Sequence, residues 1–173
     1  MAMDTLFDLL KRIGGLERAP RTSRGDYPAP RSPYKPTLLL AALWRIHRGI
    51  EPFSSNRMEF ARCLADFSRL YTRIYGNSLD MEVKASQAFW YLGAGKPQLW
   101  ELVPKPGMED QLASLIDAKA QVKTANKLAK HVAFARFSPD HWNLLSDSDV
   151  QKALISFLIA EQFIDIRREL DEL

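Results

Sequence analysis

Cationic and aromatic side chains suited to binding phosphate gather in one stretch of this sequence, Arg18 to Leu43 (RAPRTSRGDYPAPRSPYKPTLLLAAL). Arginine and lysine bind phosphate oxygens, and tyrosine offers an aromatic face with a polar tip. Prolines stiffen the segment, so it loses less conformational entropy when it docks on a partner. We expect the front of a DNA-binding surface here, and Arg24 or Arg31 could reach a base edge. The candidates for phosphate contacts are Arg21, Arg24, Arg31 and Lys35.

A second interpretation of the same stretch is an extended ligand segment for a partner protein, because PAPRSPYKP is rich in proline. Under this interpretation, charge reversal at Arg24 and Arg31 changes nothing on DNA. Tyr34 has an alternative of its own, which is to pack on the helix that it precedes.

No set of residues typical of an active site accompanies this stretch. The three histidines, His47, His131 and His141, are scattered, and none belongs to a zinc-binding motif. The single cysteine, Cys63, lies among the apolar positions of a predicted helix and is expected to be a small buried hydrophobe. Phosphate-binding glycine loops and the Gly-x-Ser-x-Gly motif are absent. The sequence therefore predicts a binding protein and not an enzyme, with no catalytic residues, metal or cofactor.

Charge is distributed unevenly along the chain, although the net charge is only +3. Residues 17–48 carry seven basic and two acidic side chains, whereas residues 139–173 carry three basic and eight acidic ones. Four lysines in the middle are spaced as on one face of a helix, which fits either a second surface for a polyanion or a solvated lysine face. They are Lys119, Lys123, Lys127 and Lys130.

Length and composition indicate a single domain, residues 1–173, long enough for a real core. The lone cysteine excludes an internal disulfide framework. No apolar run approaches the ~18 residues of a membrane span. The N-terminus is not a signal peptide, because it carries Asp4 and Asp8 among its leucines. We expect a cytoplasmic protein that does not engage a membrane.

Hydrophobic periodicity predicts an α+β fold that is predominantly helical, with helices packed around a small β-hairpin or short sheet. The expected helices cover residues 5–13, a central helix from about Pro36, residues 58–75, 108–130 and 139–145, and a last helix from Ser146. Gly14-Gly15 and Gly76 should end helices, Asn56 should cap one, and Ser146 with Asp149 forms a weak capping box. The aromatic runs 88–92 and 99–103 predict the hairpin, and residues 50–53 predict a further short strand.

Four motifs follow one another in a fixed order. They are SPYKPTLLLAAL, Ala88–Leu92 (AFWYL), Trp100-Glu101-Leu102, and Trp142-Asn143-Leu144-Leu145 before a helix ending in Phe163. The set resembles the sulfur-binding domain of McrA-type, HNH-associated, phosphorothioate-dependent restriction endonucleases, from about residue 18 to 165. The resemblance implies a type IV restriction role in bacterial defence, in which duplex DNA is recognised where sulfur replaces a non-bridging phosphate oxygen. It also implies a nuclease domain or subunit as a partner, because no HNH nuclease motif is found in this sequence.

The resemblance further implies which residues form the site. DNA contacts would come from Arg21, Arg24, Arg31, Ser32, Tyr34, Lys35, Ser86 and Gln87. The family builds its cavity around a Tyr-Pro-x-x-Ala segment, whose named positions are Gln87, Ala88 and Tyr91 here, so all three differ from the family pattern. The expected sulfur cavity comprises Pro33, Tyr34, Ala88 and Tyr91. A general DNA reader, or a reader of base modifications, is the alternative within the same class of function.

Overall fold

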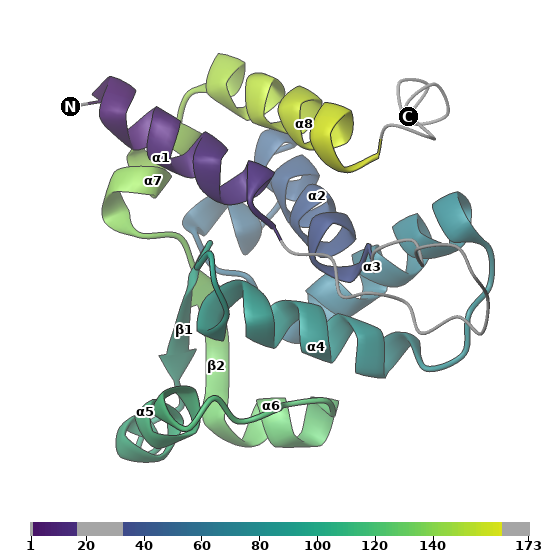
Figure 1. The fold of residues 1–173 in the computed structure, drawn as a ribbon, viewed down its shortest axis with the longest axis vertical. Coiled ribbons are helices and arrows are strands. Elements are labelled where there is room, and N and C mark those ends of the chain that lie inside the picture. The colour runs from purple at the N-terminus through teal and green to yellow at the C-terminus, as the bar shows by residue number, and fades with distance from the viewer. Residues whose placement is uncertain (1, 17–32, 164–173) are drawn as a thin grey trace, which may run out of the picture.

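The computed structural model describes residues 2–16 and 33–163, and this part of the chain is mostly helical (Figure 1). Its helices are α1 (Ala2–Gly14), α2 (Tyr34–His47), α3 (Phe60–Tyr75), α4 (Met81–Ala94), α5 (Glu109–Asp117), α6 (Ala125–His131), α7 (Pro139–Leu145) and α8 (Ser148–Gln162). A short 3-10 helix, η1 (Phe53–Ser55), and two strands, β1 (Glu101–Pro104) and β2 (Val132–Arg136), complete it. The predicted α+β class is confirmed.

Helix α2 lies at the centre of the core, as predicted. Its apolar run Leu38–Leu43 is buried on all sides, so the helix needs a neighbour on every face. Helices α3, α4 and α8 supply those neighbours, and Figure 1 shows α2 between α8 and α4. The helix begins at Tyr34, two residues before Pro36, which therefore falls in its first turn, where a missing N–H leaves no bond unmade.

The outer helices α1 and α3 lie where helices were predicted, although Phe7, expected on the apolar side of α1, is 64% exposed. Helix α1 buries Leu9 and Ile13 and packs against α7 and α8. Helix α3 buries Cys63 and Phe67, and it ends at Gly76 as predicted. The backbone of Gly76 has φ +81, a conformation that favours glycine.

The prediction of a strand over residues 88–92 is wrong, because this segment lies in the middle of α4. Aromatic residues favour strands, but the small and apolar side chains Ala85, Ala88, Phe89 and Leu92 recur at helical spacing and are all buried. Trp100 still meets this run: its ring centroid lies 5.1 Å from that of Phe89, and its Nε1–H donates to the Phe89 carbonyl oxygen over 3.1 Å.

The sheet is antiparallel but is not the predicted hairpin. Strand β1 pairs with β2, and the two helices α5 and α6 separate these strands in the sequence. Glu101 lies opposite Arg136 and Leu102 opposite Ala135, and the register shifts between Val103 and Pro104. The strand predicted over residues 50–53 is also wrong, because a turn and the start of η1 occupy those positions.

Two predicted caps are wrong. Asn56 adopts a left-handed conformation after η1, and its side chain bonds the backbone N–H and carbonyl of Phe137 instead of the start of α3. Helix α8 is capped by Asp147, whose carboxylate accepts from the N–H groups of Asp149 and Val150, so Ser146 makes no capping box.

The long helix predicted over residues 108–130 is interrupted. Residues 118–124 separate α5 from α6, and Lys119 has φ +50, which a helix cannot accommodate. The four lysines from Lys119 to Lys130 therefore do not share one helix face, contrary to the prediction. Among the described residues, no helix combines the length and apolar character needed to cross a bilayer.

Gly93 marks the closest approach of α4 to β1, and replacing it tests this packing. A Cβ at Gly93 would lie 2.5 Å from Cγ of Leu102, so Gly93→Ala should lower the free energy of unfolding by about 1–3 kcal/mol through overpacking. Gly14→Ala is the control, because its Cβ would make only ordinary contact with Phe157 at 3.7 Å. Urea denaturation should show Gly14→Ala at or above the wild type; equal stability of the two variants would contradict the packing argument.

Candidate nucleic-acid interface

The predicted site residues come from two helices that pack together. Arg21, Arg24, Arg31 and Ser32 lie outside the described residues. Pro33, Tyr34 and Lys35 lie at the start of α2, and Ser86, Gln87, Ala88 and Tyr91 lie on α4. Since α2 packs against α4, the two segments that the resemblance pairs occupy adjoining elements.

Burial divides these residues into two groups. Ser86 is 0% exposed and Ala88 is 1% exposed, and Pro33 is also buried. Their side chains reach no surface ligand without a rearrangement, whereas Tyr34, Lys35, Gln87 and Tyr91 are partly exposed. The Ser86 hydroxyl has no hydrogen-bond partner among the described residues. The binding roles of both groups stay predictions.

Lys84, which the sequence analysis did not single out, joins the two helices. Its ammonium group lies 5.9 Å from the ring centroid of Tyr34 and 5.8 Å from that of Tyr71, within the range of cation–π attraction. The same group donates to the Leu79 carbonyl oxygen over 2.7 Å and to the Ser78 hydroxyl. Tyr34 also packs on Tyr71 of α3, with centroids 6.0 Å apart, so its packing role is real.

The position of Lys84 beside the predicted site residues could have been predicted from its spacing in the sequence. It precedes Gln87 by three positions and Tyr91 by seven, which places all three on one stripe of a helix. The prediction of a strand over residues 88–92 concealed this stripe, because the spacing has meaning only when one helix runs from Met81 through Tyr91.

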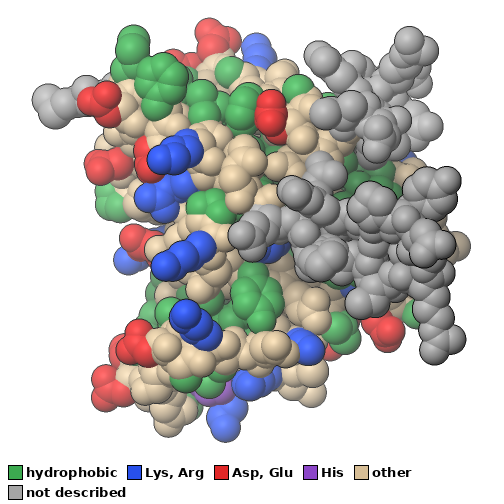
Figure 2. Space-filling model, in the orientation of Figure 1, with side chains coloured by type: hydrophobic (Ala, Val, Ile, Leu, Met, Phe, Trp, Pro, Cys, Tyr) green, Lys and Arg blue, Asp and Glu red, His purple; other side chains and the backbone are tan. Residues whose placement is uncertain are grey.

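Exposed lysines lie on the segments that adjoin α4. We call Lys96, Lys119, Lys123 and Lys127 the lysine face. The segment that carries Lys119 and Lys123 is held against α4 by the indole N–H of Trp90, which donates to the Ala120 carbonyl oxygen over 3.1 Å. Figure 2 shows Lys and Arg side chains running down this side of the molecule, over α1, the turn after α4, and the region of α4 and α6.

The lysine face carries uncompensated charge. Within residues 33–163, no carboxylate pairs with Lys96, Lys119 or Lys123, and Lys127 donates only to the Gln121 carbonyl oxygen. Unpaired ammonium groups on one side of a protein attract polyanions and raise their rate of association. The middle lysines are exposed cations, and both a surface for a polyanion and a solvated lysine face stay predictions, although the helix on which they were predicted is interrupted.

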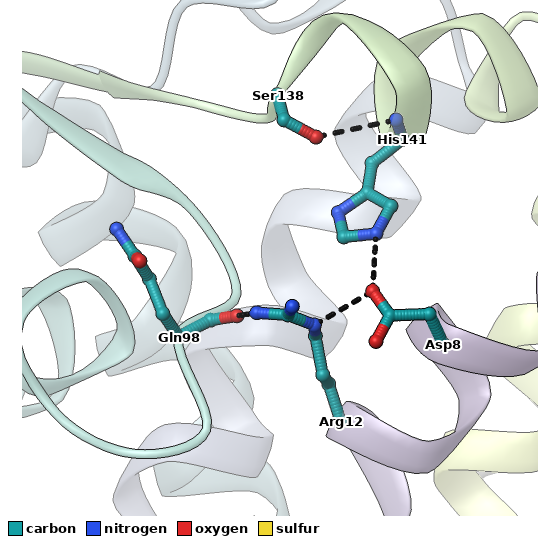
Figure 3. Close-up of polar contacts among 5 residues, drawn as sticks. All are labelled: Asp8, Arg12, Gln98, Ser138 and His141. Carbon is teal, nitrogen blue, oxygen red and sulfur yellow. Dashed lines mark hydrogen bonds and ion pairs between the residues drawn. The ribbon is translucent and has the colours of Figure 1, made fainter. Parts of the chain in front are cut away.

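A polar network ties α1 to α7 and contains a serine, a histidine and an aspartate (Figure 3). The Nε2 atom of His141 lies 3.1 Å from Oδ2 of Asp8, which also accepts from Nε of Arg12 over 2.8 Å. Arg12 then donates to the Gln98 carbonyl oxygen over 2.7 Å. The Ser138 hydroxyl accepts from the backbone N–H of His141, so it caps α7 and is not aligned with the imidazole as a nucleophile would be.

The remaining candidates for chemistry, Cys63 and His47, lie in contacts that stabilise the fold. Cys63 is buried, and burial together with the charges of Asp66 and Glu59 raises the pKa of its thiol far above the ordinary value. Nδ1 of His47 lies 2.9 Å from Oε1 of Gln151, linking α2 to α8. Within the described ranges, no three His, Cys, Asp or Glu side chains form a group that could hold a metal ion.

Comparison with known proteins adds no family. No protein-family model matches this chain, and no curated protein matches it. The resemblance to sulfur-binding domains therefore stays a prediction from the motifs.

The Asp8 network predicts an acid-dependent loss of stability. Burial disfavours the charged carboxylate, but hydrogen bonds and charges from Arg12 and His141 outweigh it and lower the pKa of Asp8 below 3.8. The stabilisation is therefore complete above this ordinary value and is lost as the pH falls through the native pKa. Asp8→Asn should cost less than about 1 kcal/mol at neutral pH, because the pair is half exposed.

Urea denaturation across the acid range measures this difference. The gap between the wild type and Asp8→Asn should close as the pH falls. Asp117→Asn is the control, because Asp117 is exposed and has no partner among the described residues. If the free energies of unfolding of the wild type and Asp8→Asn stay a constant distance apart across the acid range, the Asp8 network does not cause the loss of stability.

Proposed function

We propose that this protein is a DNA-binding recognition domain. Its binding surface comprises the start of α2, the outer stripe of α4 and the lysine face. The observation that carries the proposal is the unpaired charge of Lys96, Lys119 and Lys123 on segments that adjoin α4, the helix that bears the partly exposed Gln87 and Tyr91. Cations of this kind supply affinity for phosphates, while a glutamine and an aromatic ring can contact base edges or apolar groups.

The finer proposal is that the ligand is duplex DNA with a phosphorothioate linkage. Sulfur is larger and less strongly hydrated than oxygen, so an apolar wall accepts it at a small desolvation cost. The same wall would strip an oxygen of a hydrogen bond, at a cost of ~1–3 kcal/mol, or about one to two decades of affinity. Tyr91 is the accessible apolar side chain of the predicted cavity on α4.

Several further roles belong to this proposal. The protein binds DNA and does not cut it, it works with a nuclease domain or subunit in type IV restriction, and it acts in the cytoplasm. Metal-dependent nicking of DNA by the purified chain would contradict the first of these. The alternative of a proline-rich interaction module rests on residues 28–36, most of which lie outside the described residues.

The general electrostatic part of the proposal predicts a salt dependence. Each lost phosphate contact lowers the slope of log affinity against log salt by about 0.9, so Lys119→Gln/Lys123→Gln should lower it by about 2. Lys152→Gln on α8 is the matched control and should leave the slope unchanged. Anisotropy titrations of a duplex at several salt concentrations measure both; no binding of any duplex at micromolar protein would reject DNA binding.

The sulfur preference has its own test. A duplex with one sulfur-substituted linkage should bind about 10- to 100-fold more tightly than the same duplex with oxygen. Tyr91→Ala should reduce this ratio and leave affinity for the oxygen duplex nearly unchanged, whereas Tyr75→Ala should leave the ratio intact. Ala88→Glu would be a poor probe of binding, because Ala88 is buried and a buried carboxylate would destabilise the fold. If the wild type binds the two duplexes equally, the sulfur preference is rejected and only the proposal of general DNA binding remains.

A further inference from the structure

A pocket of about 370 Å³ opens between α2 and α3, apart from the residues of the proposed DNA surface. Four arginines line it: Arg45 from the last turn of α2, Arg48 at the C-cap of that helix, and Arg69 and Arg73 from α3. Among the described residues that line it, Asp66 is the one carboxylate, and Trp44 and Leu70 contribute apolar surface. The sequence analysis passed over this set, because its members are dispersed among apolar positions of two helices.

Only one of these arginines is neutralised. Nη2 of Arg45 lies 2.5 Å from Oδ1 of Asp66, and both side chains are largely buried. Arg48, Arg69 and Arg73 are exposed at the rim, and no described residue pairs with them. The pocket therefore carries a net charge of +3 from four arginines and one aspartate.

The helical spacing makes these charges converge. Arg69 and Arg73 are four positions apart, and Arg45 and Arg48 are three apart, so each pair lies on one side of its helix. Like charges at such spacing repel one another and destabilise the empty helix slightly. A bound anion would remove this repulsion, and planar guanidinium groups match the oxygens of a phosphate with two parallel hydrogen bonds.

We propose that the pocket between α2 and α3 is a binding site for a phosphate group. Arg48, Arg69 and Arg73 bind its oxygens, and Trp44 and Leu70 face the organic part of a phosphorylated ligand. Asp66 is a positioning residue, because its ion pair fixes the guanidinium of Arg45 at the base of the pocket. The proposal does not depend on sulfur reading or on the lysine face.

Thermal unfolding in inorganic phosphate, compared with chloride at equal ionic strength and pH, tests the site. Phosphate at a hundred times its Kd should raise the Tm of the wild type by about 5–10 °C. Arg69→Gln/Arg73→Gln should match or slightly exceed the wild-type Tm in chloride, because repulsion is relieved, and should lose most of the phosphate shift. Arg48→Gln tests the facing helix in the same way.

Arg62→Gln is the matched control, since Arg62 is an exposed arginine of α3 that pairs with Glu59 outside the pocket. It should keep the full phosphate shift. The proposal is overturned if phosphate stabilises the wild type no more than chloride does, or if Arg69→Gln/Arg73→Gln keeps the shift.

Two further arms identify the source of the phosphate. If Arg69→Gln/Arg73→Gln also binds duplex DNA at least tenfold more weakly, the site takes a backbone phosphate. If its affinity for DNA is unchanged while the phosphate shift is lost, the site takes a small phosphorylated ligand, and adenosine 5′-monophosphate should then give a larger shift than inorganic phosphate. Because the phosphate shift is measured without DNA, failure of DNA binding leaves this test intact.

Discussion

The burial of α2 on every side is the constraint on which the rest of the structure depends. A helix with a continuous apolar surface is stable in water only when other elements enclose it. Helices α3, α4 and α8 meet that need, and each keeps some side chains exposed or partly exposed. Partly exposed side chains of α2 then remain only near its ends: Tyr34 and Lys35 at the start, and Trp44, Arg45 and His47 in the last turns. Side chains of α2 that could contact a ligand therefore lie only near the two ends of the helix.

The cations of the protein divide by whether a carboxylate meets them. Asp8 pairs with Arg12 on its own helix and with His141 of α7, and Glu101 pairs with Arg136, so carboxylates join α1 to α7 and β1 to β2. Such half-exposed pairs contribute little energy, but they fix the orientation of neighbouring elements. Within residues 2–16 and 33–163, no carboxylate pairs with Lys96, Lys119, Lys123 or Lys127 of the lysine face, or with Arg48, Arg69 and Arg73 at the rim of the arginine pocket. These two surfaces can therefore attract anions, despite a net charge of only +3.

Sequence patterns predicted the elements whose periodicity and propensity agree. The leucine run of α2, the amphipathic stripe of α1 and the glycine after α3 each point to one structure. Sequence patterns failed where the intrinsic preference of a segment for strand or helix differs from what its packing in the fold requires. Phe89, Trp90 and Tyr91 favour a strand, yet the segment is a helix that packs against α2 and α3 and buries Ala85, Ala88, Phe89 and Leu92 at helical spacing.

The candidate sites were harder to predict for a related reason. A break at residues 118–124 has no proline, so the lysine spacing alone suggested a continuous helix. The arginine pocket exists only because α2 and α3 pack together, and two pairs of arginines on separate helices look like ordinary solvated positions until that contact is known.

The way in which β2 is enclosed bears on how the folded chain avoids self-association. One edge of β2 pairs with β1, and its other side is met by Met58, whose backbone exchanges hydrogen bonds with Ala135 over 2.8 and 2.9 Å. The outer edge of β1 has no backbone partner among the described residues; β1 is only four residues long, starts with a charged Glu101 and ends in Pro104, a residue with no N–H to offer an incoming strand. Short length, charge and proline are the features by which natural sheets resist edge-to-edge aggregation, and here they coincide on β1.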